Sequence, residues 1–145
     1  MEIGENSKLG CTQCHYIAYN SPTRLRLWEK DAIIKIGERC HLNSVNISAR
    51  KLVEIGDDAV FACGIQILDT DEHLVVSTNR AKERDIPSPV IIGNNVWIGL
   101  NALILKGTII GDNCVVGAGA VVKGKFPANC VIAGNPAKIV KRFEL

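Results

Sequence analysis

Aliphatic residues recur at every sixth position through the second half of the chain. From Ile92 onward, each step of six meets another Ile or Val as far as Val122. A fixed short period of this kind is typical of a solenoid, in which each repeat is one structural unit stacked on the next. The residues four places after these positions are mostly small, and they are Val96, Ala102, Thr108, Cys114, Ala120 and Phe126.

Each hexad predicts a short strand followed by a corner. The aliphatic residue points inward, and Gly or Asn relieves the corner, where a positive φ is often needed. Three hexads close one triangular coil of about 18 residues, and stacked coils pair their strands in parallel. Residues 92–109 are therefore expected to form one coil and residues 110–127 the next.

The repeat continues upstream with two changes of phase. Apolar residues keep the six-residue step within Ile36–Leu42 and again within Ile55–Ile67, and the phase slips by one residue between these groups. The second slip coincides with residues 70–88, which are rich in charged residues and Asn and predict an external loop. The β-helix is therefore expected to cover residues 34–134.

The two ends of the chain depart from the repeat. Residues 1–33 are less regular and are expected to cap the helix, with Arg24-Leu25-Arg26-Leu27 as an edge strand. Asn135-Pro136 is typical of an N-cap followed by Pro at the first helical position, so residues 135–145 predict a short C-terminal helix, helical from 136 to 144. The whole chain, 1–145, is expected to be a single all-β domain with this one helix.

Composition narrows the functional classes. The 17 Lys and Arg nearly balance the 15 Asp and Glu, which gives no broad field for nucleic acid or an acidic membrane. The start of the chain is polar, and no apolar run reaches the roughly 18 residues of a membrane span, so we expect a cytoplasmic protein without a signal peptide. Its six Cys are expected to be reduced.

Two motifs carry a resemblance to a known family. Gly93-Asn-Asn-Val-Trp97-Ile-Gly99 and Ala133-Gly-Asn-Pro136, within residues 34–143, resemble hexapeptide-repeat acyltransferases. The similarity extends to galactoside and maltose acetyltransferases and to the O-acetyltransferases of capsule and O-antigen synthesis. The resemblance implies a left-handed parallel β-helix, a homotrimer with active sites at subunit interfaces, and acetyl-CoA as co-substrate.

The resemblance also implies a catalytic histidine. His73 stands 24 residues before Trp97, the separation that the family has between its catalytic His and the Trp of the second motif. An imidazole suits a general base because it titrates near neutral pH. If the stretch stays extended, Asp69 and Asp71 share a face with His73, where a carboxylate orients the ring or holds a cationic acceptor amine. Asn43 matches a family residue that contacts the acceptor.

Further residues are candidates for the acceptor site. Trp97 occupies an outward hexad position, where a large aromatic is expected to cover substrate or a neighbouring subunit. Arg84, with Arg80 and Lys82, is a candidate contact for an anionic acceptor such as a nucleotide-linked or uronic sugar. The alternative is that these three residues only keep a loop solvated.

The positions that match the family's coenzyme A contacts are Leu100, Ala118, Lys123, Lys138 and Lys141, with Arg142 adjacent, and Gly99 is a further candidate for the coenzyme site. The N–H of Leu100 is the candidate oxyanion donor, and Gly99 lets a ligand approach the backbone, unless it is only a corner glycine. Basic side chains suit phosphate oxygens. The sequence Lys123-Gly124-Lys125 departs from the Thr-Lys-Asp that is frequent in the family.

One further motif points elsewhere. Cys11-Thr-Gln-Cys14-His15 matches the c-type haem attachment pattern and half of a zinc site. Neither a second CxxC nor an evident axial Met accompanies it, so packing in the N-terminal cap is the preferred interpretation. We expect no metal.

The leading functional hypothesis is O-acetylation of a saccharide hydroxyl by direct transfer from acetyl-CoA. Two alternatives remain open: N-acylation of an amino sugar, often nucleotide-linked, and a catalytically silent β-helix that serves as a scaffold subunit.

Overall fold

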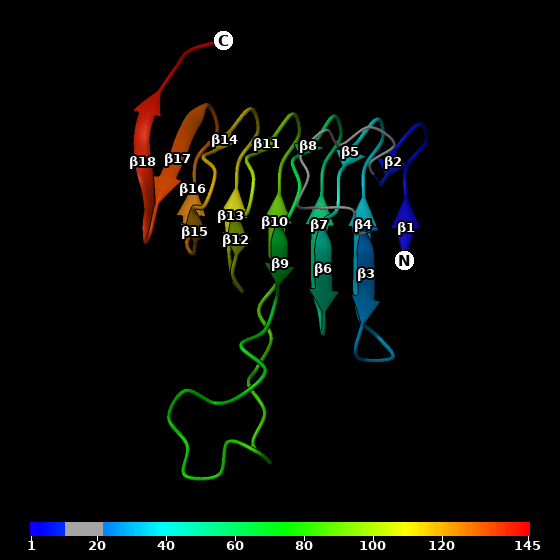
Figure 1. Cartoon of the computed structure of the whole chain (residues 1–145), viewed down its shortest axis with the longest axis vertical. Helices are drawn as coiled ribbons and strands as arrows, with labels where there is room; N and C mark the ends of the chain where they lie inside the picture. Colours follow the sequence, from blue (N-terminus) through cyan, green and yellow to red (C-terminus); the bar gives the residue numbers. More distant parts are fainter. Residues whose placement is uncertain (11–21) are drawn as a thin grey trace.

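The computed structural model describes residues 1–10 and 22–145, which wind into a prism with three walls of parallel β-strands (Figure 1). Sheet A contains β1 (Glu2–Ile3), β4 (Ile33–Ile36), β7 (Leu52–Ile55), β10 (Val90–Ile92), β13 (Ile109–Ile110) and β16 (Lys125–Phe126). Sheet B contains β2 (Lys8–Leu9), β5 (His41–Leu42), β8 (Val60–Phe61), β11 (Trp97–Ile98), β14 (Val115–Val116), β17 (Cys130–Gly134) and β18 (Ala137–Arg142). Sheet C contains β3 (Arg24–Leu27), β6 (Asn46–Ala49), β9 (Gln66–Leu68), β12 (Leu103–Ile104) and β15 (Val121–Val122).

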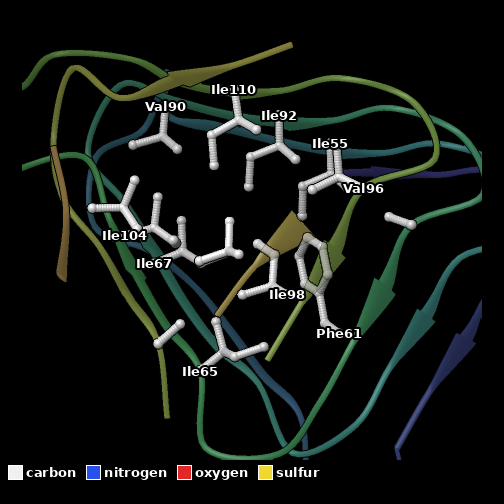
Figure 2. Packing of buried hydrophobic residues seen from close by; sticks show 14 of the residues in the cluster. Ile55, Phe61, Ile65, Ile67, Val90, Ile92, Val96, Ile98, Ile104 and Ile110 are labelled. Atoms are coloured by element: carbon white, nitrogen blue, oxygen red, sulfur yellow. The ribbon is translucent and has the colours of Figure 1, made fainter. Parts of the chain in front are cut away.

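The hexad residues form the core of the prism, as the period predicts. Ile92 pairs with Ile110 in sheet A and Ile98 with Val116 in sheet B, so partners in neighbouring coils face the same interior. These side chains are buried and converge from all three walls (Figure 2). Each fully buried aliphatic side chain of this kind contributes about 1.5–3 kcal/mol to folding.

Asn and Gly, which the sequence places at the corners, have different roles there. Asn95, Asn113 and Asn129 adopt positive φ values of 52°, 57° and 60°. Their side chains form a ladder between coils, with Nδ2 to Oδ1 distances of 2.9 and 3.0 Å. Gly99 and Gly111 are needed for space instead, because a Cβ atom would lie 2.6 Å from the backbone N of Ala118 and 2.5 Å from that of Ala128, respectively.

The last coil is shorter than predicted. Phe126 pairs with Ile110 and so occupies an inward strand position, whereas the hexad count places Phe126 at a small-residue site. The chain passes from β15 to β16 through Lys123 and Gly124 alone, and Gly124 has a φ of +123° that other residues rarely adopt. This glycine therefore permits the tight corner that shortens the coil.

The predicted C-terminal helix is wrong, because residues 137–142 form strand β18. This strand pairs antiparallel with β17 through a turn at Asn135-Pro136, in which the peptide bond is cis. The hairpin covers the backbone edge of β17, and Ile139 packs against the core. No α-helix occurs in the described ranges.

Strands also continue into the segment before residue 34. There β1, β2 and β3 pair in parallel with β4, β5 and β6, and β3 is the edge strand of sheet C. The loop between β9 and β10 projects away from the prism (Figure 1). It starts at a corner between sheets C and A, on the opposite side of the triangle from sheet B.

Candidate active site

A pocket of about 420 Å³ lies on the outer side of sheet B. It is lined by residues of strands β11 and β14 and by the corners that follow β5, β8, β11 and β14. Its lining residues are Asn43, Ala62, Cys63, Trp97, Gly99, Leu100, Val115, Val116, Gly117 and Ala118. Candidates for both acceptor and coenzyme contacts, which lie far apart in the sequence, therefore meet in one pocket.

Trp97 forms one wall of this pocket and is 55% exposed. Its strand pairs with β8 and β14, which places Trp97 beside Val60 and Val115 in one outward-facing row. A half-exposed indole beside aliphatic side chains provides an apolar surface for a ligand. Asn43 lies at the other end of the pocket, where its Nδ2 donates a hydrogen bond to the carbonyl of Phe61 at 3.2 Å.

The corner after β11 presents backbone groups to the pocket. The carbonyl of Leu100 accepts a hydrogen bond from the N–H of Gly119 at 2.7 Å. Among the described residues, no backbone carbonyl accepts the N–H of Leu100 itself. Gly99 keeps the coils in close contact here, so the corner role of this glycine is structural whether or not a ligand also uses the space.

His73 lies in the external loop and is exposed. Its Nδ1 atom is 2.6 Å from the carbonyl oxygen of Arg80, so Nδ1 carries the proton and donates it to that oxygen. This hydrogen bond leaves Nε2 as the basic nitrogen of the neutral ring. His73 also forms an isolated antiparallel bridge with Arg84, whose Nη1 lies 3.3 Å from Nδ1.

The expected alignment of Asp69 and Asp71 with His73 does not form. Glu72 has a φ of +64°, so the stretch turns instead of alternating as an extended strand would. The buried carboxylate of Asp69 accepts hydrogen bonds from the backbone N–H groups of Arg50, Lys51 and Leu52, at 2.8, 2.6 and 2.9 Å. It therefore holds a neighbouring corner of the prism.

Asp71 also has another partner. Its Oδ2 atom lies 2.8 Å from the ammonium of Lys106. A backbone carbonyl, rather than a carboxylate, thus fixes the His73 ring. The carbonyl of Arg80 could not be identified from the sequence because it depends on how the loop folds back.

The candidate phosphate ligands lie at the end of the prism that β18 closes. Lys123, Lys138, Lys141 and Arg142 are all exposed. Lys141 pairs with Val131, which lies in the same outward row as Val115 and Trp97. Arg142 pairs with the buried Cys130 and belongs to the next row.

His73 does not line the pocket on sheet B. The loop that carries it joins sheet C to sheet A, so His73 and the pocket lie at different corners of the triangle. Sequence spacing alone, such as that between His73 and Trp97, gives no indication of this separation.

The CxxCH motif of Cys11, Cys14 and His15 lies outside the described residues. Within residues 1–10 and 22–145 there is no group of His, Cys, Asp or Glu that could hold a metal ion. Cys40, Cys63, Cys114 and Cys130 are buried, and none of these four forms a disulfide. Burial raises the pKa of the Cys130 thiol to about 11, so this residue acts as a small core side chain. No helix in the same ranges is long and apolar enough to cross a membrane.

Comparison with known proteins supports the family resemblance. The pattern of the family described as "Hexapeptide repeat of succinyl-transferase" matches residues 89–123. Galactoside O-acetyltransferase of Escherichia coli is 37% identical over 112 residues, which cover 77% of this chain and 55% of that protein. The chain thus spans about half the length of this curated relative.

Two solved structures have the same architecture. A galactoside acetyltransferase in complex with coenzyme A is 30% identical, with a TM-score of 0.82 over 99% of this chain and 65% of that one. A maltose O-acetyltransferase from Clostridium difficile is also 30% identical, with a TM-score of 0.70 over 97% of this chain and 71% of that one. The chain belongs to the hexapeptide-repeat acyltransferase family.

Proposed function

We propose that the chain is an acetyl-CoA-dependent acetyltransferase that acetylates a saccharide hydroxyl. The observation that carries this proposal is the convergence of Asn43, Trp97, Gly99, Leu100 and Ala118 on one pocket. Both similar solved proteins named above are sugar acetyltransferases, and one of them binds coenzyme A. These proteins share the architecture that positions the pocket.

In the proposed reaction, Nε2 of His73 removes the proton of the acceptor hydroxyl as its oxygen attacks the thioester carbonyl carbon. The N–H of Leu100 stabilises the negative charge on the carbonyl oxygen. The C–S bond then breaks, and the leaving coenzyme A sulfur receives the proton from the imidazolium. The products are the acetyl ester and free coenzyme A thiol.

The reaction requires His73 and the pocket to meet, and we propose that a homotrimer brings them together. The loop of one copy would reach the sheet B pocket of its neighbour. Two observations support this arrangement. His73 is absent from the pocket of its own chain, and Val75 and Val76 beside it are 71% and 92% exposed. Apolar side chains this exposed suit a subunit contact.

Lys138 and Lys141 are proposed to bind the nucleotide phosphates of coenzyme A, with Lys123 and Arg142 nearby. Asn43 and Arg84 are proposed to contact the acceptor. We further propose a reducing, cytoplasmic location in polysaccharide synthesis, which agrees with four buried cysteines that form no disulfide.

The function is tested by incubating the protein with acetyl-CoA and galactose, maltose, N-acetylglucosamine or glucosamine while free thiol is followed. Release that depends on a sugar hydroxyl, with a product that loses acetate in mild base, supports O-acetylation. A base-stable product formed only with glucosamine indicates N-acetylation instead. No calorimetric binding of coenzyme A at millimolar concentration would reject the enzyme and favour a scaffold subunit.

The proposed assembly is tested separately by sedimentation equilibrium. A mass of three chains is expected. Full turnover by a monomer would overturn the shared site.

A further inference from the structure

Lys106 lies at the base of the external loop, after strand β12 in sheet C. Its ammonium is 2.8 Å from Oδ2 of Asp71 and 2.6 Å from Oδ2 of Asp85. The three side chains are largely shielded, with exposures of 19% for Lys106, 28% for Asp71 and 9% for Asp85. Ion pairs removed from solvent in this way are screened less than surface pairs.

The two aspartates belong to opposite arms of the loop. Asp71 lies on the outgoing arm and Asp85 on the returning arm, and the N–H of Asp71 donates to Oδ2 of Asp85 at 3.0 Å. The N–H of Asp85 in turn donates to the carbonyl of Glu72 at 3.3 Å. The Lys106 ammonium therefore adds to these direct contacts between the arms and ties both arms to the wall of the prism.

This junction lies next to the histidine. Beyond it, the next contact between the arms is the bridge of His73 with Arg84. His73 is two residues from Asp71, and Arg84 is adjacent to Asp85. The position of the imidazole thus depends on where the two arms meet, and Lys106 holds that meeting point together with the hydrogen bonds between the arms.

We propose that Lys106 is a positioning residue for His73, a role that rests on the proposed function. It touches neither the pocket nor the imidazole, but it fixes the two arms that carry the ring and the carbonyl of Arg80. Loss of the ammonium leaves two carboxylates close together with no cation between them, and their repulsion separates the arms. Displacement of a catalytic group by about 1 Å can lower a rate about 100-fold.

The test compares Lys106→Met, which removes the charge but keeps the length, with Lys106→Arg, which can bridge both carboxylates. Lys51→Met is the matched control, because Lys51 is exposed and its side chain forms no ion pair within the described ranges. Turnover is measured with acetyl-CoA and the sugar that releases thiol fastest. Coenzyme A affinity is measured by calorimetry.

For Lys106→Met we expect turnover to fall about 10- to 100-fold. The affinity for coenzyme A should stay within about twofold, because the pocket lies on another sheet. Lys106→Arg should restore most of the turnover, and Lys51→Met should resemble the wild type. Unchanged turnover in Lys106→Met, or an equal loss in Lys51→Met, would overturn the proposal.

Two readouts do not depend on turnover. The chain has three His residues, so nitrogen-15 spectra can follow the His73 ring, which should carry its proton on Nδ1 in the wild type and lose this preference in Lys106→Met. Trypsin should cut the variant faster within the loop, at Arg80, Lys82 and Arg84, than elsewhere in the chain. An unchanged ring tautomer, or uniform cleavage, would reject the positioning role.

These readouts also separate the two proposals. If wild-type protein shows no turnover, the proposed function fails, while the spectra and the cleavage pattern still decide the role of Lys106. If Lys106→Met does not fold, Asp85→Asn removes the closer of the two ion pairs and is expected to give the same pattern in weaker form. A wild-type pattern in that variant would contradict the proposal.

Discussion

Trp97 and Lys141 occupy the same outward-facing row of sheet B, with Val115 and Val131 between them. Neighbouring strands in a sheet are about 4.8 Å apart, so three strand spacings separate the backbones of these two residues by about 14 Å. The two residues are 44 positions apart in the sequence, and the register of the coils aligns them. In the proposed function, coenzyme A would lie along this row, from the apolar pocket to the ammonium of Lys141.

The first prediction concerns Lys141, at the cationic end of this row. Lys141→Met should weaken coenzyme A binding about fivefold, or ~1 kcal/mol, because an exposed contact between charges is worth little more. Pantetheine, which lacks the nucleotide phosphates, should bind equally to variant and wild type. Isothermal titration calorimetry at low and high salt measures both ligands.

The matched control for Lys141 is Lys8→Met. Lys8 lies at the opposite end of the same outward row, where it pairs with His41. Equal losses of coenzyme A affinity in the two variants would contradict a phosphate contact at β18.

The second prediction concerns the aromatic wall of the pocket. Trp97→Ala should lower ligand affinity about tenfold yet change the free energy of unfolding by only about 0.5 kcal/mol, since the indole is half exposed. Trp28→Ala is the comparison, because Trp28 is 51% exposed and lies outside this pocket. Urea denaturation and calorimetry give the two quantities, and a stability loss above 2 kcal/mol in Trp97→Ala would assign this residue to folding instead.

The third prediction concerns His73. His73→Ala should keep the affinity for coenzyme A and lose about 10²- to 10⁴-fold in turnover, the range of general-base catalysis. His73→Asn is a sharper variant, because its amide N–H can still donate to the carbonyl of Arg80 but cannot take a proton. Both variants should be equally inactive in the thiol-release assay. Turnover that persists in either one rejects His73 as the base.

The fourth prediction separates the two roles of the corner glycines. Gly99→Ala and Gly111→Ala both place a methyl group against backbone of the next coil, so each should cost about 1–3 kcal/mol in urea denaturation. Gly99 lines the pocket and Gly111 does not. Coenzyme A affinity in the folded protein should therefore fall only in Gly99→Ala. Equal affinities would leave Gly99 with a packing role alone.

The fifth prediction concerns acid stability. The hydrogen bond from Lys106 holds the pKa of the Asp85 carboxyl below its usual value. A carboxyl whose pKa is lower in the folded state contributes stability above its unfolded pKa of about 3.9, and this contribution is lost as pH falls through the folded pKa. The difference in unfolding free energy between wild type and Asp85→Asn should be constant near neutrality and shrink below about pH 4. Urea denaturation from pH 2.5 to 7 checks this, and a difference that stays constant to pH 2.5 would refute it.

Regular hexads made much of the fold predictable. The inward positions from Ile92 to Val122 follow from the period because each strand must bury one side chain per repeat. The shortened coil at Phe126 could not be predicted, since it depends on the unusual backbone angle of Gly124. The sequence of β18 also fits a helix, because Ile139, Val140 and Phe143 form a helical stripe, and only the pairing with β17 makes the segment a strand.

The part of the candidate site that the six-residue repeat positions was predictable from the sequence. Trp97, Gly99, Leu100 and Ala118 meet because coils stack in fixed register, which the spacing already contains. The surroundings of His73 were not predictable. Glu72 turns the backbone, so the partners of the ring and of Asp71 come from the far arm of the loop and from another coil.

The β17–β18 hairpin also affects whether copies of the protein can associate through their sheet edges. A parallel solenoid that ends on a bare strand offers a template on which a second copy can add, and repeated addition would give fibres. Here one edge of sheet B is an antiparallel strand that carries Lys138, Lys141 and Arg142. Like charges on this strand repel the same strand of a second copy, so the cations proposed to hold the coenzyme would also disfavour pairing of two copies through this edge of sheet B.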